Sequence, residues 1–301
     1  MRFELGQEII DMLLGKRHLR HLTPFWKRNI DTPDYLSIVA ILKNEAPYIK
    51  EWIEYHKLVG VERFYLYDNE SEDNLKEMLQ SYIDNGIVIY KYFPGKAMQY
   101  MAYYDAIKKY KYKTKWLAFI DADEFIIPIS KVTLNEYLKE FEDYPALVVN
   151  WVMYDSNGHI KKPDGLVIEN YTRTFKDSNA FQNLYFKSIV NPRKVKYCQD
   201  PHFCEYMNNQ KAVNENSIPI DGPGSFSRTK NNSVKTIRIN HYYSKSKNEF
   251  IAKYNRGSAC NNNPETIREK DYNFPETKQD FIMEKYVIEL KLRLKTLLLH
   301  D

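Results

Sequence analysis

The sequence predicts an α/β fold in which a mainly parallel, Rossmann-like sheet is flanked by helices. Between residues 36 and 154, short runs rich in β-branched and aromatic residues alternate with segments of helical period. The β-rich runs are apolar almost throughout, which is typical of parallel strands buried on both faces. Polar clusters directly follow three of these runs, where open α/β sheets bind their ligands. These observations indicate a chain built from right-handed βαβ units.

The predicted elements follow one another in regular order through this region. A first strand at 36–42 precedes a helix for which Asn44 is a suitable N-cap and Pro47 a suitable first-turn residue. Thr133 and Glu136 have the spacing of a capping box that opens a helix to residue 141. The other predicted strands are 63–67, 87–92, 116–120 and 146–153, and the other predicted helices are 73–84 and 98–110.

The region after residue 155 has a looser pattern of turns, short strands and loops rich in Asn, Pro and Gly. Residues 260–274 are typical of a mobile loop and could form a lid. The last segment predicts an amphipathic helix, because apolar side chains recur at every fourth position with Lys and Arg between them. These apolar positions are Ile282, Tyr286, Leu290, Leu294 and Leu298.

Composition limits the partners and the compartment. The 301 residues carry a formal net charge of +4, too small a surplus to indicate nucleic acid as a partner. Cys198, Cys204 and Cys260 lack the paired short spacing of a zinc site, so we expect reduced thiols in a cytoplasmic protein. No apolar run approaches the roughly 20 residues that span a bilayer, and the N-terminus lacks a signal-peptide core.

Both ends of the chain carry amphipathic segments with basic residues. Near the N-terminus, an apolar cluster at 9–14 precedes a basic stretch that contains Phe25 and Trp26. Such segments either pack on the core or on a second copy, or lie peripherally on an anionic membrane surface. The sequence leaves the oligomeric state open.

The most informative motif is Asp121-Ala122-Asp123, at the exit of the predicted strand 116–120. Two Asp side chains two residues apart in extended backbone project from the same face and can hold a hard divalent cation. Such a cation, Mn²⁺ or Mg²⁺, can clamp a diphosphate and stabilise its charge as a Lewis acid when it departs. His241 follows a β-like run at 236–240 and is the candidate third ligand, and an imidazole favours Mn²⁺.

A nucleotide would have to be held without the usual glycine-rich loops. No Gly-x-x-x-x-Gly-Lys loop and no Gly-x-Gly-x-x-Gly turn follows the first strand, so neither phosphate-loop nucleotidases nor dinucleotide enzymes are supported. Basic residues close to His241 in the sequence, Lys245 and Arg256, are the candidates to contact phosphate oxygens.

These residues, with others around them, resemble glycosyltransferase family 92, which lies within the GT-A fold. The resemblance runs from about residue 36 to residue 257. The stretches that carry it are Lys43-Asn44-Glu45, Glu51-Trp52, Tyr55-His56, residues 67–71 and 121–125, Asn150-Trp151, Gly158-His159, residues 187–190, Pro201-His202, residues 239–242, Lys245-Ser246, Glu249-Phe250, Lys253 and Arg256-Gly257.

On the donor side, the resemblance implies a metal-dependent, inverting glycosyltransferase that uses a UDP-sugar, with galactose favoured. It implies that Asn44 and Glu45 border the base pocket and that Asp68 contacts the uridine. Asp121 would face the ribose or the metal. The direct metal ligands that it implies are Asp123 and His241.

On the acceptor side, the resemblance implies roles for Trp151, His159 and His202. Where family members often have Phe-Gly-Ser-Ser-Gly-His, residues 154–159 read Tyr-Asp-Ser-Asn-Gly-His, so the acceptor can differ. An inverting transfer also needs a general base within about 3 Å of the acceptor hydroxyl. The candidate bases, with the favoured one first, are Glu205, Asp155 and Asp221.

Three parts are therefore expected along the chain. Residues 1–33 form a helical, basic extension, and residues 34–257 form the glycosyltransferase domain. Within that domain, residues 34–154 would hold the nucleotide-sugar and residues 155–257 the acceptor, while residues 258–301 form the mobile loop and terminal helix. The expected acceptor is a glycan or a lipid-linked sugar in surface polysaccharide synthesis. The alternatives are a sugar-1-phosphate nucleotidyltransferase and a non-catalytic carbohydrate-binding or membrane-scaffold protein.

Overall fold

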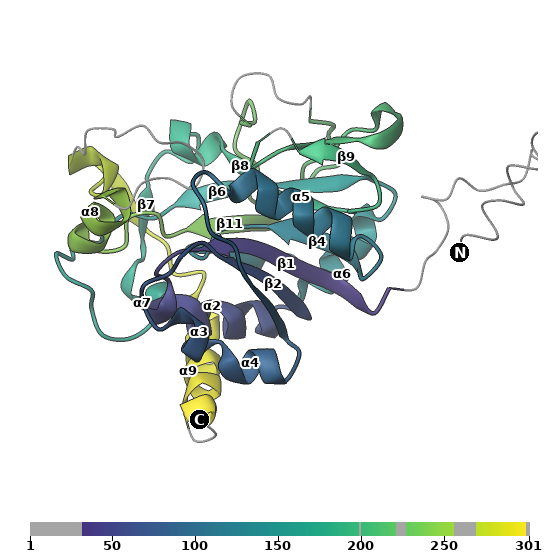
Figure 1. Ribbon diagram of the computed structural model, residues 1–301. Coiled ribbons are helices and arrows are strands. Elements are labelled where there is room, and N and C mark those ends of the chain that lie inside the picture. The colour runs from purple at the N-terminus through teal and green to yellow at the C-terminus, as the bar shows by residue number, and fades with distance from the viewer. Residues whose placement is uncertain (1–31, 199, 221–226, 256–268, 299–301) are drawn as a thin grey trace, which may run out of the picture. The chain divides into compact units, whose positions relative to one another are not determined.

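The structure is a computed structural model that describes residues 32–198, 200–220, 227–255 and 269–298 (Figure 1). The expected N-terminal extension 1–33 lies almost wholly outside the described residues. Most of the predicted loop at 260–274 lies outside them too. The limits predicted at 154/155 and 257/258 stay predictions.

An eight-stranded mixed sheet forms the centre of the described chain, in the order β3-β2-β1-β4-β8-β6-β11-β5. Neighbours are parallel from β3 to β4 and between β6 and β11, whereas β8 and β5 run antiparallel to their neighbours. The α/β fold with a mainly parallel sheet is thus confirmed. The strands are β1 Asp34–Leu42, β2 Arg63–Asp68, β3 Val88–Tyr92, β4 Thr114–Phe119, β5 Glu124–Pro128, β6 Ala146–Met153, β8 Phe186–Val190 and β11 Ile237–His241.

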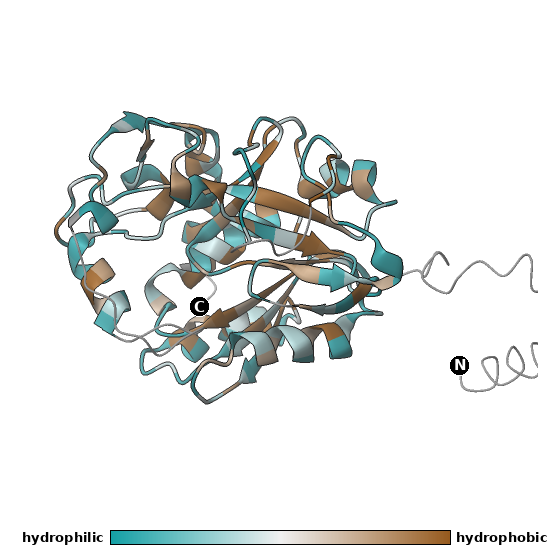
Figure 2. Cartoon of the chain, turned by 90° about the horizontal axis from the view of Figure 1, so that it is seen from above, coloured by the Kyte–Doolittle hydropathy of each residue, from teal (hydrophilic) through white to brown (hydrophobic). Residues whose placement is uncertain are grey.

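Helices cover both faces of this sheet (Figure 1). In β1, Leu36, Ile38 and Ala40 belong to one buried cluster while Val39 and Ile41 belong to another, because side chains alternate across a strand. Figure 2 shows the same layering, with hydrophobic strands between more polar helices. The helices are α2 Ala46–Leu58, α3 Leu75–Met78, α4 Gln80–Asp84, α5 Gln99–Tyr110, α6 Leu134–Leu138, α7 Val167–Asn170, α8 Lys247–Asn255 and α9 Glu284–Leu298.

Shorter elements complete the second half of the chain. Strands β9 Val195–Cys198 and β10 Cys204–Tyr206 form an antiparallel hairpin, and β7 Arg173–Phe175 pairs with β12 Thr277–Gln279. The 3₁₀-helices are Lys139–Phe141, Phe181–Leu184, Met207–Asn209 and Glu269–Asp271. The pairing of β7 with β12 joins the region beyond residue 269 to the main body.

Helix starts test the local predictions. The capping box is confirmed, since the Glu136 backbone N–H donates to Thr133 Oγ1 (3.2 Å) and the Thr133 backbone N–H to Glu136 Oε2 (3.4 Å). Asn44 as N-cap is wrong: α2 starts after Glu45, and Asn44 adopts a left-handed conformation with φ of 57°. The helix predicted at 73–84 is broken at Leu79 into α3 and α4.

The C-terminal helix α9 packs on α2. Leu290 is fully buried, and the rings of Tyr286 and Tyr55 meet edge to face at 5.2 Å between centroids. Its far side exposes Ile288 and Leu292, so contact of this helix with a membrane stays a prediction. Over the described ranges, every helix falls short of the length and apolarity that crossing a bilayer requires.

Candidate functional site

The Asp121-Ala122-Asp123 segment forms a tight turn between β4 and β5. The turn is closed by the Glu124 backbone N–H, which donates to the Asp121 carbonyl at 3.1 Å. In return, the Asp121 backbone N–H donates to Oε2 of Glu124 at 2.9 Å. The predicted extended geometry is therefore wrong, because the chain turns here and enters β5. Strand β5 pairs with β11 and was missed by the sequence prediction. The turn lies beyond the end of β4.

Two lysines from distant elements neutralise the two aspartates. Lys187 of β8 is only 1% exposed, and its Nζ lies 2.8 Å from Oδ2 of Asp121. Lys253 of α8 places its Nζ 2.5 Å from Oδ2 of Asp123. The sequence prediction gave neither lysine a role in the site. The available signal was Lys187 itself, since a lysine inside an apolar strand is buried only where opposite charge meets it.

Charge and burial set the protonation of this cluster. Burial alone would raise the pKa of Asp121 and of Asp123, but Lys187 and Lys253 respectively hold these carboxyl pKa values below their usual range. Burial raises the pKa of Glu124 well above its usual value, although the charge of Lys187 opposes this. Burial also lowers the pKa of His241, more than Asp123 raises it. The imidazole is therefore neutral at neutral pH and has a nitrogen lone pair to offer.

An aromatic row extends from the aspartate turn towards the β9–β10 hairpin. Nε2 of His241 lies 3.5 Å from Oδ1 of Asp123. The Trp151 ring packs on His241 at 4.4 Å and on His202 at 5.3 Å between centroids. Of the three predicted acceptor-side residues, Trp151 thus packs on the predicted metal ligand His241, and His202 packs on Trp151. The third, His159, lies instead against Tyr171.

The predicted nucleotide-side residues gather at the ends of β1 and β2. Asp68 is paired in register with the last residue of β1 and accepts hydrogen bonds from the Ser71 backbone N–H (2.9 Å) and the Tyr90 hydroxyl (2.5 Å). Ser71 Oγ in turn accepts from the Asn44 backbone N–H at 3.0 Å. Because β1, β2 and β4 are parallel, these groups and the aspartate turn share one edge of the sheet, as predicted.

Two further contacts connect the predicted residues. Lys245, a predicted phosphate contact, lies 3.3 Å from Oε2 of Glu45 and over the ring of Tyr48 at 3.7 Å. Gln99, in the first turn of α5, donates to Oδ1 of Asp121 at 3.1 Å. Arg256, the other predicted phosphate contact, lies outside the described residues.

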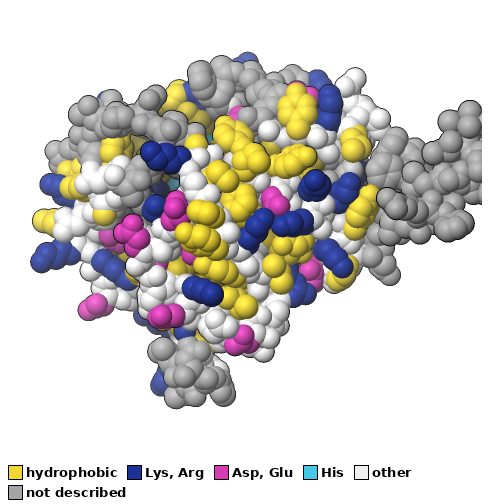
Figure 3. Space-filling model, viewed as in Figure 1, with side chains coloured by type: hydrophobic (Ala, Val, Ile, Leu, Met, Phe, Trp, Pro, Cys, Tyr) yellow, Lys and Arg dark blue, Asp and Glu magenta, His cyan; other side chains and the backbone are white. Residues whose placement is uncertain are grey.

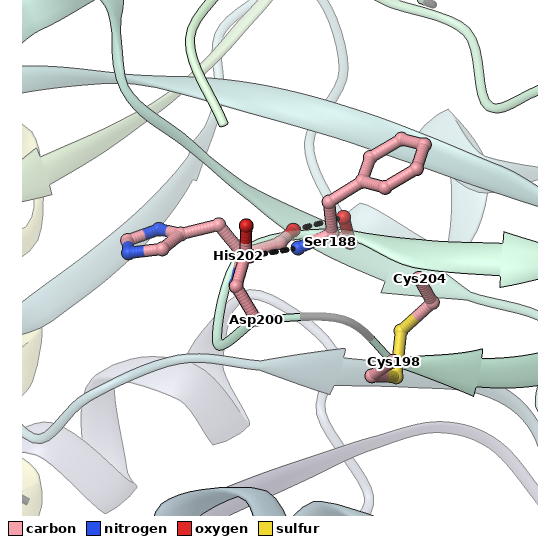
Figure 4. The surroundings of a disulfide bond; sticks show 6 residues. Ser188, Cys198, Asp200, His202 and Cys204 are labelled. Atoms are coloured by element: carbon pink, nitrogen blue, oxygen red, sulfur yellow. Dashed lines mark hydrogen bonds between the residues drawn. A yellow bond between two sulfur atoms is a disulfide. The ribbon is translucent and has the colours of Figure 1, made fainter. Parts of the chain in front are cut away.

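A disulfide closes the loop that presents His202, so the expectation of reduced thiols is wrong for Cys198 and Cys204. These cysteines face each other across the β9–β10 hairpin, and this pairing is set by tertiary structure, not by a spacing motif. Figure 4 shows the His202 ring directed away from the disulfide. The carbonyl of Phe186 accepts a hydrogen bond from Nδ1 of His202 at 2.8 Å. The thiol argument for a cytoplasmic location no longer holds.

The candidate bases have unequal surroundings. Asp155 is fully buried, and its carboxylate accepts hydrogen bonds from the Arg173 guanidinium at 3.0 and 2.7 Å. Glu205 on β10 is partly exposed and lies 3.7 Å from Nζ of Lys196. Asp221 lies outside the described residues. A carboxylate within reach of an acceptor hydroxyl therefore stays unassigned.

The donor atoms near the turn suit a divalent cation in type. Within the described ranges, no three His, Cys, Asp or Glu side chains converge closely enough to hold a metal ion as they stand. Oδ1 of Asp123 and Nε2 of His241 nevertheless face each other, and an oxygen with an imidazole nitrogen is a donor pair that Mn²⁺ accepts. Asp123 and His241 are therefore the residues that would hold such a cation, which would add a second positive partner to Asp123 besides Lys253.

One face of the molecule carries charges of both signs. On the face drawn in Figure 3, the described Lys and Arg side chains are interspersed with acidic and hydrophobic ones. This mixture agrees with the small net charge of the chain.

Carboxylates, an imidazole and a buried lysine gather at the edge beyond the parallel strands, which is where open α/β proteins bind their ligands. The sequence profile of glycosyltransferase family 92 matches residues 39–281. The chain belongs to this family, and the resemblance inferred from its sequence is confirmed.

Relatives in plants agree with this family. A rice glycosyltransferase family 92 protein, Os08g0121900, is 25% identical over 206 residues, which are 67% of this chain and 35% of that protein. Galactan β-1,4-galactosyltransferase GALS2 of Arabidopsis thaliana is 29% identical over 171 residues, 51% of this chain and 30% of that protein. The chain thus spans about a third of the length of these relatives.

Solved structures match more loosely. S. aureus TarS is 15% identical, with a TM-score of 0.34 over 52% of this chain and 47% of that one. The mannosyltransferase PcManGT from Pyrobaculum calidifontis, solved with GDP-Man and Mn²⁺, is 19% identical, with a TM-score of 0.30 over 48% of this chain and 43% of that one. The family assignment therefore rests on the sequence profile.

Proposed function

We propose that this chain is an inverting, metal-dependent glycosyltransferase that moves a sugar, with galactose favoured, from a UDP-sugar to a glycan or lipid-linked acceptor. The observation that carries the proposal is the pairing of Asp121 and Asp123 with Lys187 and Lys253, beside His241, at the ligand-binding edge of the sheet. Membership of family 92 supports the activity, and the names of the galactosyltransferase relatives support the sugar.

The donor would lie along the edge from β2 to the aspartate turn. Asp68 would accept a hydrogen bond from the uridine, with Asn44 and Glu45 bordering the base. Both carboxylate oxygens of Asp121 already have protein partners, Gln99 and Lys187. We therefore assign Asp121 to the ribose and not to the metal. In this order the diphosphate would lie next to Asp123.

The diphosphate would be held by positive charges next to Asp123. Asp123 and His241 would hold Mn²⁺ or Mg²⁺, which when bound neutralises charge on the departing diphosphate. The Lys253 ammonium, displaced from Asp123, has a phosphate oxygen as its natural new partner, because charge-assisted hydrogen bonds to phosphate are among the strong ones. Lys245 offers a third positive charge. Lys253 would thereby exchange a carboxylate partner for a phosphate partner and keep an ionic partner throughout.

The acceptor would approach from the side of Trp151 and His202. An aromatic plane next to the cleavage point can stack on a sugar face and exclude water. In the neutral ring of His202, Nδ1–H donates to the Phe186 carbonyl. Nε2 therefore has the lone pair and can accept a hydrogen bond from a hydroxyl. Glu205 remains the sequence-based candidate for the base. Product use in surface polysaccharide synthesis, at the inner membrane face, belongs to the same proposal.

Donor turnover tests this function. The protein is incubated with Mn²⁺ and a panel of UDP-sugars, and UDP release is followed without acceptor and with candidate glycans. We expect slow release from UDP-galactose that EDTA stops and that Asp123→Asn abolishes. Asp34→Asn is the matched control, because Asp34 starts β1 and is ion-paired with Arg63 at the opposite edge of the sheet. Release of pyrophosphate from a nucleoside triphosphate, with no UDP-sugar turnover, would contradict the proposal.

A further inference from the structure

Two buried polar atoms beside the aspartate turn face each other without a hydrogen-bond partner. They are Nδ1 of His241 and Oε1 of Glu124, 3.8 Å apart. Glu124 is fully buried and His241 is 4% exposed, so water does not satisfy them in the way it does at a surface. Unpaired buried polar atoms are rare in folded proteins because each costs the desolvation of the group. A facing pair of them therefore calls for a function.

The surrounding structure restricts the orientations of the Glu124 carboxyl group and the His241 imidazole. His241 and Glu124 are directly opposite in the antiparallel pairing of β11 with β5. Oε2 of Glu124 is held by the Asp121 backbone N–H, so Oε1 is the oxygen turned to the ring. Trp151 packs against the imidazole, whose other nitrogen, Nε2, lies 3.5 Å from Oδ1 of Asp123. The imidazole thus lies between two carboxyl groups, one facing each ring nitrogen.

We propose that Glu124 is a positioning residue for His241. A cation held by His241 and Asp123 favours the ionised form of Glu124. Oε1 then accepts a hydrogen bond from Nδ1–H and so fixes the tautomer in which the Nε2 lone pair points towards Asp123. Histidines that bind metals commonly donate their second N–H to a carboxylate, which sets both the ring orientation and the basicity of the binding nitrogen. The inference rests on the proposed function, in which Asp123 and His241 hold a divalent cation.

The test measures Mn²⁺ binding by electron paramagnetic resonance on the full chain without nucleotide. Glu124→Gln keeps the side-chain volume but offers only one acceptor oxygen, so it cannot serve both the Asp121 N–H and the His241 Nδ1–H. We expect Mn²⁺ affinity to fall by about 10- to 100-fold, the usual effect of removing such a partner. Glu215→Gln is the control, since Glu215 is another buried glutamate, held by backbone N–H groups of residues 235–237.

A double-mutant cycle separates positioning from general damage. If Glu124 acts through His241, Glu124→Gln changes Mn²⁺ affinity less than about twofold in a His241→Ala background. An equal loss in both backgrounds would overturn the inference. A wild-type protein that binds no Mn²⁺ would contradict the proposed function and this inference with it. Wild-type binding that Glu124→Gln leaves unchanged would overturn the inference alone.

A measurement on the unmutated protein covers the case in which a variant does not fold. Two-dimensional ¹⁵N–¹H spectra of the histidine side chains, recorded with saturating Mg²⁺, report which ring nitrogen carries the proton. We expect the proton of His241 on Nδ1. A proton on Nε2 in the presence of the cation would overturn the assignment.

Discussion

The ammonium nitrogen of Lys253 lies 2.5 Å from Oδ2 of Asp123, and Nε2 of His241 lies 3.5 Å from the other oxygen of the same carboxylate. The lysine comes from α8 and the aspartate from the turn after β4, 130 positions apart in the sequence. One carboxylate therefore has two partners, and the lysine is the positively charged one. In the proposed reaction, Lys253 competes with the cation for Asp123. Its ammonium group then donates a hydrogen bond to a phosphate oxygen of the diphosphate.

Lys253→Met should separate these two roles. Without its competitor, Mn²⁺ should bind the nucleotide-free protein about fivefold more tightly, the equivalent of roughly 1 kcal/mol for a partly exposed ion pair. UDP in the presence of Mn²⁺ should bind more weakly, because a phosphate contact is lost. Isothermal titration calorimetry measures both. Lys247→Met, an exposed lysine on the same helix, is the control. Weaker Mn²⁺ binding in Lys253→Met would contradict the competition.

Asp68→Asn should weaken nucleotide binding while leaving the fold intact. The amide can still accept from the Ser71 N–H, and the Tyr90 hydroxyl can turn from donor to acceptor. Loss of the charged acceptor should reduce UDP affinity about tenfold, in line with roughly 1.5 kcal/mol for a hydrogen bond to a charged group. Equilibrium binding of UDP with Mn²⁺ checks this. Asp34→Asn, at the far end of β1, should bind UDP like the wild type; equal losses in both variants would remove Asp68 from the site.

Glu51 should make stability depend on pH. Burial raises the pKa of this carboxyl to about 7, against the lowering effect of the backbone N–H groups of Val167 and Ile168. The native state therefore holds the proton more tightly than the unfolded chain. The stabilisation is complete below the unfolded pKa and is lost as the pH rises through 7. Relative to Glu51→Gln, which does not titrate, the wild type should lose roughly 2 to 3 kcal/mol between pH 5 and pH 8.

Urea unfolding of both proteins at pH 5 and pH 8 measures this difference. Glu249, whose pKa burial also raises to about 7, is present in both proteins and cancels from the comparison. Glu77→Gln, an exposed substitution on α3, should follow the wild type at both pH values. A constant gap between wild type and Glu51→Gln would contradict the raised pKa.

The Cys198–Cys204 disulfide should stabilise the hairpin that carries His202. Closing so short a loop contributes roughly 2 kcal/mol by the chain-entropy estimate. The double variant Cys198→Ser, Cys204→Ser should therefore unfold at lower urea concentration, whereas Cys260→Ser should not. Thiol titration of the unreduced, denatured protein should find one free thiol among the three cysteines. Three free thiols in protein purified without reductant would contradict the disulfide.

Local signals predicted much of the fold. The strands predicted at 36–42 and 146–153 appear as β1 and β6. Continuous apolar runs of that length are typical of strands that are buried on both faces. The capping box at Thr133 also appeared as predicted, since both of its partners lie within one turn. Strand β5 was missed because its pairing with β11 joins residues about a hundred positions apart, which no local pattern encodes.

The candidate site divides in the same way. The sequence by itself determined that carboxylates follow two apolar strands: Asp121 and Asp123 follow one, and Asp68 ends another. Parallel pairing brings such strand ends to one edge whatever the details of the loops. Only the tertiary structure decided that Lys187 and Lys253 meet those carboxylates, that Cys198 bonds to Cys204, and that Glu124 faces His241. These contacts join elements through the packed interior, where burial makes the partner of each charge matter and where sequence distance gives no measure of proximity.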